Sequence, residues 1–281
     1  MMAVTREILV KSLLCKSGIS DYCVNCYTGC LHGCVYCYAR FMKRFSGHEE
    51  PWGQFLDIKV NAPNVLAKEV RRHKSSLFDQ PIRVFMSSVC DGWQPAEKRY
   101  KLSRQCLQIL ADAGFSVGVL TKSALITRDF DILRASPACD LGCTLTTLDE
   151  SLRLVIEPAA SPTRERIAAL ERAVEEGIRA WAFLGPFMPG LSDTSEALTV
   201  LIRAVATVPV EFIYVDKINP RPGVWNSVVQ FLHRRHPELM PMYRQLFCDA
   251  LAYEEYCAEL GGRIRAIASA EGVLEKLRMG F

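Results

Sequence analysis

Short apolar runs alternate with longer amphipathic segments along most of the chain. Six of the runs have the length of buried strands, and they cover residues 21–25, 82–87, 116–120, 141–146, 180–184 and 211–216. The segments between them place their apolar residues on one helical face. A repeated strand–helix order is typical of a parallel sheet with helical crossovers. The pattern therefore predicts an α/β fold, with a sheet that stays open or curls into a whole or partial barrel.

Capping and stop residues mark four of the helices. Ser161 and Ser103 are predicted N-caps, and Gly177 and Gly114 are predicted to end the same two helices. Two more helices are expected from 127 to 136 and from about 193 to 208. After residue 221 the pattern is wholly helical. We therefore expect a barrel over residues 1–221 and a helical C-terminal extension over residues 222–281.

Composition narrows the class of protein only slightly. The 281 residues are 49% hydrophobic and 23% charged, which is ordinary for a globular protein. The net charge of +3 makes a nucleic-acid partner possible but does not indicate one, because a dedicated DNA-binding enzyme should carry a basic stripe. Charges at Arg6, Glu7 and Lys11 interrupt any signal-peptide core, and no apolar run is long enough to cross a membrane. We expect a cytoplasmic protein without a membrane partner.

Polar and unusual residues follow five of the predicted strands. In parallel α/β sheets, ligands bind at the carboxyl ends of the strands, so these residues mark the expected active site. They are Cys90 and Asp91, Lys122, Thr146 and Thr147, residues 186–190 and residues 217–221. Among the last group, Lys217, Asn219 and Arg221, with Trp225 beyond them, are expected where a substrate enters.

The densest group of cysteines lies in "NCYTGCLHGCVYCYAR", residues 25–40. Cys30, Cys34 and Cys37 form the pattern C-x3-C-x2-C, and in a reducing compartment clustered cysteines are more often metal ligands or catalytic groups than disulfides. Three thiolates can bind three irons of a [4Fe-4S] cluster and leave the fourth iron without a protein ligand. The alternative is a structural zinc site with His32 as a fourth ligand.

The three-cysteine motif, with Tyr36 before its last cysteine, resembles the cluster motif of the radical S-adenosylmethionine (SAM) enzymes. The longer string around it is similar to the spore photoproduct lyase-like branch, and the likeness continues in "SSVCDGWQPAEK", "LTKSALITRDFDIL" and "PFMPGLSD". The resemblance implies a partial (β/α)6 barrel of the TIM type. It implies a [4Fe-4S] cluster bound by Cys30, Cys34 and Cys37, with SAM on the open iron.

The same resemblance implies a reaction. An electron donor such as flavodoxin or ferredoxin would reduce the cluster, and cleavage of SAM would release a 5′-deoxyadenosyl radical that takes a hydrogen atom from substrate. A nucleic-acid lesion, a peptide, an RNA or a small molecule could be that substrate. The alternative from another class is a non-catalytic iron–sulfur electron carrier or a zinc-binding module. A carrier would need a fourth protein ligand and would have no cofactor pocket.

Further residues are candidates for SAM binding. Each also has an ordinary structural explanation, namely packing, a turn or cap, a β-branched strand residue, or a solvent-exposed arginine. By the resemblance, Tyr36 and the loop with Pro189 would lie near the adenine, and the end of the second strand would bind the methionyl amine. The candidates are Tyr36, Ser87, Ser88, Asp91, Thr146, Arg164, Arg166 and Pro189, with the arginines as clamps for the cofactor carboxylate.

Two more cysteines follow neighbouring predicted strands. Cys26 and Cys90 stand where the branch resembled here carries proline and threonine. They suggest a second metal site, completed by Cys15, Cys23 or Cys143. Cys90 is alternatively a hydrogen-atom donor to a substrate radical, in the catalytic role that a nearby cysteine has in spore photoproduct lyases. Isolated buried thiols would explain both positions as well.

Overall fold

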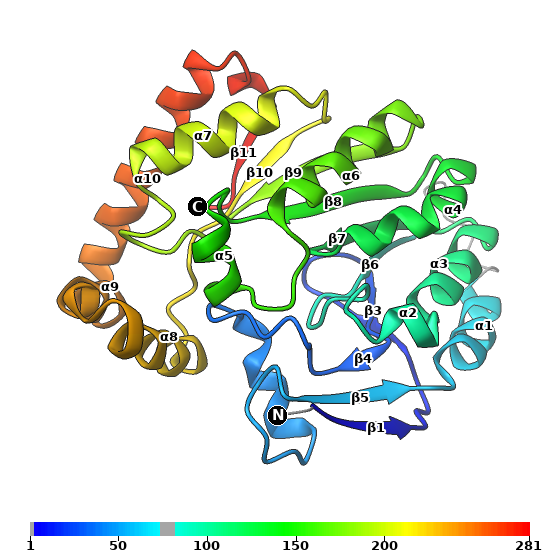
Figure 1. Cartoon of the computed structure of the whole chain (residues 1–281). Helices are drawn as coiled ribbons and strands as arrows, with labels where there is room; N and C mark the ends of the chain where they lie inside the picture. Colours follow the sequence, from blue (N-terminus) through cyan, green and yellow to red (C-terminus); the bar gives the residue numbers. More distant parts are fainter. Residues whose placement is uncertain (1–2, 74–81) are drawn as a thin grey trace.

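The computed structural model describes residues 3–73 and 82–281. Within them the main feature is a curved eight-stranded sheet in the order β11-β10-β9-β8-β7-β6-β3-β2 (Figure 1). All neighbours from β3 to β11 are parallel, and β2 is antiparallel to β3. The strands are β2 Leu14–Lys16, β3 Tyr22–Val24, β6 Arg83–Met86, β7 Ser116–Thr121, β8 Asp140–Leu145, β9 Arg179–Leu184, β10 Ile213–Val215 and β11 Leu277–Met279.

The six predicted strands correspond to β3, β6, β7, β8, β9 and β10, and their parallel order confirms the α/β prediction. Their apolar residues are buried on both faces, as expected for a parallel sheet covered by helices. The sheet has edges at β2 and β11, so it is an open barrel. The carboxyl ends of its parallel strands, β3 and β6 to β11, all point toward one side, and this arrangement positions the site described below.

A smaller three-stranded sheet was not predicted from the sequence. It has the order β1-β5-β4, and its strands are β1 Val4–Ile8, β5 Phe55–Lys59 and β4 Tyr27–Thr28. β5 is parallel to β1 and antiparallel to β4. The cysteine-rich loop begins directly after β4, so this sheet supports one side of the site.

Helices cross between the strands and cover the outer face of the large sheet (Figure 1). They are α1 Ala62–His73, α2 Glu97–Tyr100, α3 Leu102–Asp112, α4 Phe130–Ala135, α5 Glu150–Ile156, α6 Thr163–Glu175 and α7 Ser195–Ala206, with the 3-10 helices η1 Tyr38–Phe45 and η2 Ala124–Asp129. The main core lies between this layer and the sheet and includes Val84, Val117, Leu141 and Leu170.

Two predicted helix caps are wrong, because tertiary contacts occupy both hydroxyl groups. Ser103 lies inside α3 and donates to the carbonyl of Gly92 at 2.8 Å. Ser161 precedes α6, and its hydroxyl accepts from the Ala124 amide at 2.9 Å instead of capping the helix. The predicted stops are confirmed: Gly114 and Gly177 follow the helices with φ angles of +79° and +76°.

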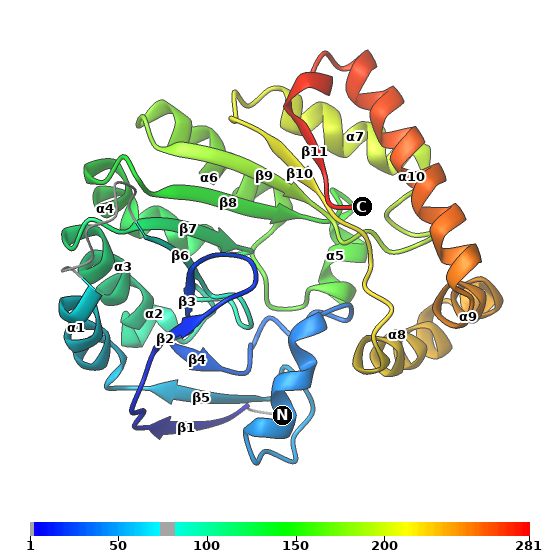
Figure 2. The ribbon, with the colours of Figure 1, turned by 180° about the vertical axis from the view of Figure 1, so that it is seen from behind.

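The region after residue 221 is helical except for β11. Its elements are α8 Pro222–Arg235, η3 Pro237–Leu239, α9 Met240–Cys248, α10 Ala250–Ala270 and η4 Leu274–Lys276. The wholly helical prediction is wrong at Leu277–Met279, which pairs with β10 and extends the large sheet (Figure 2). The division at residue 221 stays a prediction. Among the described residues, no helix is long and apolar enough to cross a membrane.

Candidate functional site

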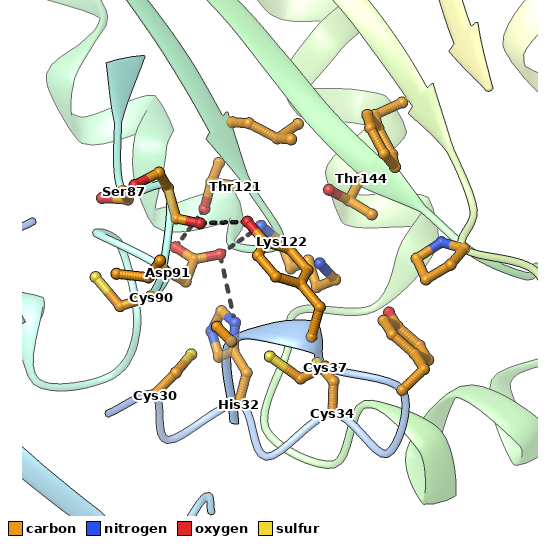
Figure 3. Close-up of a pocket in the computed structure, with 18 of the residues that line it drawn as sticks. Cys30, His32, Cys34, Cys37, Ser87, Cys90, Asp91, Thr121, Lys122 and Thr144 are labelled. Carbon is orange, nitrogen blue, oxygen red and sulfur yellow. Dashed lines mark hydrogen bonds and ion pairs between the residues drawn. The ribbon is translucent and has the colours of Figure 1, made fainter. Parts of the chain in front are cut away.

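A cavity of about 160 Å³ lies at the carboxyl ends of the central strands (Figure 3). One wall is the cysteine-rich loop between β4 and η1. The opposite wall consists of residues at the ends of β6, β7, β9 and β10. The strand-end residues Asp91, Lys122, Pro186, Lys217 and Asn219 all line it. The cavity therefore lies at the edge of the sheet where the sequence predicts the site.

Cys30, Cys34 and Cys37 line the cavity from a single loop. Turns at Cys30 and Cys34 fold the loop, because the Gly33 amide donates to the Cys30 carbonyl and the Cys37 amide to the Cys34 carbonyl, each at 3.3 Å. Gly29 precedes the loop with a φ of +90°, and a Cβ atom there would lie 2.6 Å from the Phe55 carbonyl oxygen. Only glycine fits this approach to β5. The backbone thus places all three cysteines on the wall of the same cavity.

Ser87, at the end of β6, lines this cavity and has an unpaired polar group. Its hydroxyl is buried and has no hydrogen-bond partner in the protein, and its backbone has a φ of +70°. Buried hydroxyl groups normally find a partner. A polar group of a bound ligand would supply one. The adjacent Ser88 is already engaged, because its hydroxyl accepts from the Asn25 side chain at 3.1 Å.

Asp91 lines the cavity, but protein groups occupy most of its acceptor capacity. It accepts from the Trp93 amide at 2.8 Å, the Thr121 hydroxyl at 2.8 Å and the Lys122 amide at 2.7 Å. The Nδ1 atom of His32 lies 3.4 Å from the Oδ2 atom of Asp91, the oxygen that also accepts from the Lys122 amide (Figure 3). Burial would raise the pKa of Asp91, but His32, the Lys122 amide and the Thr121 hydroxyl lower it overall, so the group stays a carboxylate. Asp91 thereby fixes the loop after β6 against β7 and the cysteine-rich loop.

Lys122, the residue after β7, was noted in the sequence as a strand-end residue but not assigned to the cofactor. Its side chain lines the cavity, with the ammonium 5.8 Å from the centre of the Tyr36 ring. Burial lowers its pKa, but Cys34, Glu157 and Asp91 outweigh burial and raise the pKa overall. The side chain therefore remains an ammonium that can bind an anionic group. In the sequence, only its position directly after an apolar strand indicated that Lys122 lies at the site.

A buried polar network lies behind Tyr36. The Tyr36 ring lines the cavity, while its hydroxyl contacts Glu157 and lies 3.1 Å from the Thr146 hydroxyl. Thr146 donates to Glu157 at 2.9 Å, and Glu157 forms a fully buried ion pair with Arg166. Arg166 also donates to the carbonyls of Thr144 and Ser161, at 2.6 and 2.9 Å. The donors of Arg166 are thus used within the protein, and neither Thr146 nor Arg166 lines the cavity.

The remaining candidates lie in different places. Arg164 is an exposed residue of α6, and Pro189 is buried in the loop after β9; neither lines the cavity, whereas Pro186 does. Sequence reasoning did not single out Phe85, Phe183 or Asp216, which also line it. No local motif distinguishes these three from ordinary strand residues.

Cys90 lines the cavity, whereas Cys26 is fully buried in the core beside Cys106 of α3. The Cys90 thiol lies 3.6 Å from the Asn25 side-chain oxygen, and burial raises its pKa to about 12. Among residues 3–73 and 82–281, no three His, Cys, Asp or Glu side chains lie together as ligands of one metal ion would. This holds for Cys30, Cys34 and Cys37 as well, so the second metal site at Cys26 and Cys90 stays a prediction.

Comparison with known proteins places the chain in a family. The profile of the radical SAM superfamily matches residues 24–201, which include the cysteine-rich loop and the barrel strands β6 to β9. The chain belongs to the radical SAM superfamily. It is therefore a radical SAM enzyme, of a family that uses a [4Fe-4S] cluster and SAM, rather than an electron carrier or a zinc-binding module.

Uncharacterized proteins are among the relatives of this radical SAM enzyme. One from Methanocaldococcus jannaschii is 29% identical over 88% of this chain and 86% of its own length. One from Mycobacterium tuberculosis is 26% identical over 85% of this chain and 74% of its own length. These relatives extend the similarity beyond the superfamily profile but carry no activity in their names.

Solved structures of spore photoproduct lyase share the fold. A mutant of that enzyme matches with a TM-score of 0.73 at 13% identity, over 99% of this chain and 82% of the lyase chain. Another lyase structure, with bound AdoMet and a dinucleoside spore photoproduct, matches with a TM-score of 0.72 at 11% identity over the same shares of the two chains. At such low identity the likeness shows the fold alone.

Proposed function

We propose that this enzyme holds a [4Fe-4S] cluster on Cys30, Cys34 and Cys37 and cleaves SAM in the cavity that these residues line. The observation that carries the proposal is the convergence of the three thiols with two groups suited to the amino-acid end of SAM. These are the unpaired buried hydroxyl of Ser87 and the ammonium of Lys122. When bound and reduced, the cluster supplies the electron that converts SAM to methionine and a 5′-deoxyadenosyl radical.

The residues of this chain would bind and orient the reactants. Lys122 would neutralise the SAM carboxylate, and Ser87 would hydrogen-bond its amino group. Tyr36, held by Glu157 and Thr146, would present its ring to the cofactor. Phe183, Asp216 and Lys217 line the cavity at the ends of β9 and β10 and would contact the substrate. The buried walls would exclude water from the radical.

Cys90 is the candidate hydrogen-atom donor within this proposal. Its sulfur lines the cavity, and its raised pKa keeps the hydrogen on the thiol at neutral pH. A donor acts after substrate activation, so it is not needed for SAM cleavage. Cys90→Ala should therefore retain the cluster and the cleavage of SAM, which separates a hydrogen donor from a cluster ligand.

Anaerobic reconstitution with iron and sulfide, followed by reduction with dithionite in the presence of SAM, tests the proposal. The wild type should bind about four irons per chain and form 5′-deoxyadenosine. Cys34→Ala should lose both, whereas Cys139→Ala, which removes a buried thiol outside the cavity, should lose neither. Lys122→Gln should bind SAM about tenfold more weakly or worse, because a charged hydrogen bond is lost. Formation of 5′-deoxyadenosine by Cys34→Ala would contradict the ligand assignment.

A further inference from the structure

A second concave surface lies beside the candidate active site, between η1 and the start of α8. It is a groove of about 800 Å³, and Tyr38 lines both this groove and the active-site cavity. Figure 2 shows η1, the lighter blue helix beside the N-terminus, next to α8. The lining residues are Tyr38, Arg40, Phe41, Lys43, Arg44, Gly47, His48, Arg221, Gly223 and Val224. None of them is a carboxylic acid.

The groove is strongly cationic although the whole chain carries only +3. Arg40, Lys43, Arg44 and Arg221 line it, and within the part of the chain that the structure describes none of the four forms an ion pair. Lys43 donates only to a backbone carbonyl, that of Glu49, at 2.8 Å. Other surface arginines, by contrast, have carboxylate partners, for example Arg83 with Asp140 and Arg179 with Glu211. Four unpaired cations over one groove attract an anionic partner.

The groove is directly connected to the predicted cluster loop. η1 starts at Tyr38, the residue after Cys37, and Arg40 donates from η1 to the Cys34 carbonyl at 2.7 Å. A partner seated on the groove would thus lie next to the loop that carries the three thiols. Two aromatic side chains of η1 are also exposed: Tyr38 is 46% exposed and Phe45 is 66% exposed. Exposed aromatic and arginine side chains are characteristic of protein interfaces.

From these observations we infer that the groove is the docking surface for an acidic one-electron carrier protein, which holds a flavin or an iron–sulfur cluster. The inference rests on the proposed function, because the carrier would reduce the cluster on Cys30, Cys34 and Cys37. In that step the carrier loses one electron and the cluster gains it, with no bond or proton transferred.

A nucleic-acid strand is the competing anionic partner, and the charge distribution favours it less. The cations are confined to the segment 40–44 and Arg221, which suits a compact acidic face rather than a stripe that follows a phosphate chain. Complementary charge would steer the acidic carrier to the groove, with an affinity that falls as salt rises.

The chain offers a matched pair of variants for a test. Lys43 and Arg44 precede Phe45, and Arg44 lies over the Phe45 ring at 4.6 Å. On α2, Lys98 and Arg99 precede Tyr100, and Arg99 lies over the Tyr100 ring at 5.1 Å. α2 lies away from α8 in both views of the molecule (Figures 1 and 2). The double variants K43E/R44E and K98E/R99E therefore make the same change in charge and stacking at two different surfaces.

The experiment measures binding of oxidised flavodoxin to the reconstituted enzyme by calorimetry at low and high salt. We expect salt-sensitive binding that K43E/R44E weakens about tenfold or more and that K98E/R99E changes less than about twofold. Equal effects of the two double variants, or no binding by the wild type, would overturn the inference. Tighter binding of a single-stranded oligonucleotide than of flavodoxin would also overturn it, if K43E/R44E abolishes that binding. The groove would then be a nucleic-acid site.

A second measurement separates this inference from the proposed function. With dithionite as reductant, K43E/R44E should form 5′-deoxyadenosine at the wild-type rate, because a small reductant does not need the groove. With reduced flavodoxin, the variant should be slower, and the loss should follow the weaker binding. If the wild type forms no 5′-deoxyadenosine with dithionite, the proposed function fails, whatever the binding data show. If dithionite and flavodoxin support K43E/R44E equally well, only the docking inference fails.

Discussion

Among single residues, Glu157 and Arg166 have the strongest influence on the shape of the candidate site. Both side chains are fully buried, and their ion pair connects β8, the loop before α6 and Tyr36 of the cysteine-rich loop. A buried charge that loses its partner is costly, because it has neither water nor an opposite charge to stabilise it. The pair therefore holds Tyr36 against the barrel.

Glu157→Gln should lower the free energy of unfolding by about 3–5 kcal/mol, because it leaves the Arg166 charge buried without a partner. Denaturant unfolding of the purified protein measures this value. The matched control is Glu211→Gln, whose carboxylate and Arg179 partner are both about half-exposed, and it should cost less than about 1 kcal/mol. Equal losses in the two variants would mean that the buried pair does not stabilise the fold.

The same variant should also change the response to acid. Burial alone would raise the pKa of Glu157, but Arg166 and Lys122 outweigh burial and lower the pKa to about 2. A glutamate in the unfolded chain has a pKa of about 4.3. The stabilisation by the carboxylate is thus complete above that pH and is lost as the pH falls toward 2. Wild-type stability should fall more steeply than that of Glu157→Gln in this window.

The sequence suggested Arg166 as a cofactor clamp, and the reason that it does not line the cavity is instructive. Its partner Glu157 lies nine positions earlier and outside the helix of Arg166, so no helical spacing connects the two. Only the folded loop between α5 and α6 brings them together. Lys122 and Ser87 were easier to locate, because each follows a strand whose apolar run is clear in the sequence.

At the level of elements, the close approach of the cysteine-rich loop to β5 depends on glycine. Gly29→Ala should disturb this approach, because the new Cβ would lie 2.6 Å from the Phe55 carbonyl at a φ of +90°. Gly47→Ala is the control, since Gly47 also has a positive φ, +66°, but has no atom within 4 Å of a Cβ. Both variants bear the backbone strain of about 1–2 kcal/mol, and only Gly29→Ala adds the clash.

We therefore expect Gly29→Ala to lose at least about 1 kcal/mol more stability than Gly47→Ala and to bind less iron on reconstitution. Thermal unfolding and iron analysis measure the two effects. Full iron binding by Gly29→Ala, with stability equal to that of Gly47→Ala, would show that the loop tolerates a wider separation from β5.

The elements differ in how well the sequence predicts them. Six strands of the large sheet were predicted because each contains a short apolar run, which in β7 and β8 is buried on both faces. β1 is mostly exposed and β4 has two residues, so neither has an apolar pattern of its own. β11 is similarly short and half-buried, and its pairing with β10 joins segments far apart in the chain. Such strands are specified by their partners rather than by local sequence.

For the whole molecule, total charge was a poor guide to surface charge. A net charge of +3 left an anionic partner possible without indicating one, yet four unpaired cations line the groove beside η1. Most other arginines are neutralised locally, for example Arg179 by Glu211 and Arg203 by Glu271. Pairing of this kind is long-range in sequence and becomes visible only in the folded structure.

The barrel and the C-terminal extension share one core. Leu260 and Ile264 of α10 are fully buried in the same apolar cluster as Leu198 and Leu201 of α7. β11, at the end of the extension, adds a strand to the barrel sheet. A core that crosses the predicted boundary at residue 221 should couple the unfolding of the two regions. We therefore expect the chain to unfold in one cooperative transition.

Ile264→Ala tests this coupling, because a cavity in a shared core should destabilise both regions together. The substitution should cost about 2–5 kcal/mol, whereas Leu251→Ala, at a position of α10 that is 65% exposed, should cost much less. Hydrogen exchange of β7 and β8 amides reports on the barrel, and that of α9 amides reports on the extension. If Ile264→Ala accelerates exchange in both regions equally, the two unfold as one unit. Faster exchange in α9 alone would show that residues 222–281 open independently, as a separate domain would.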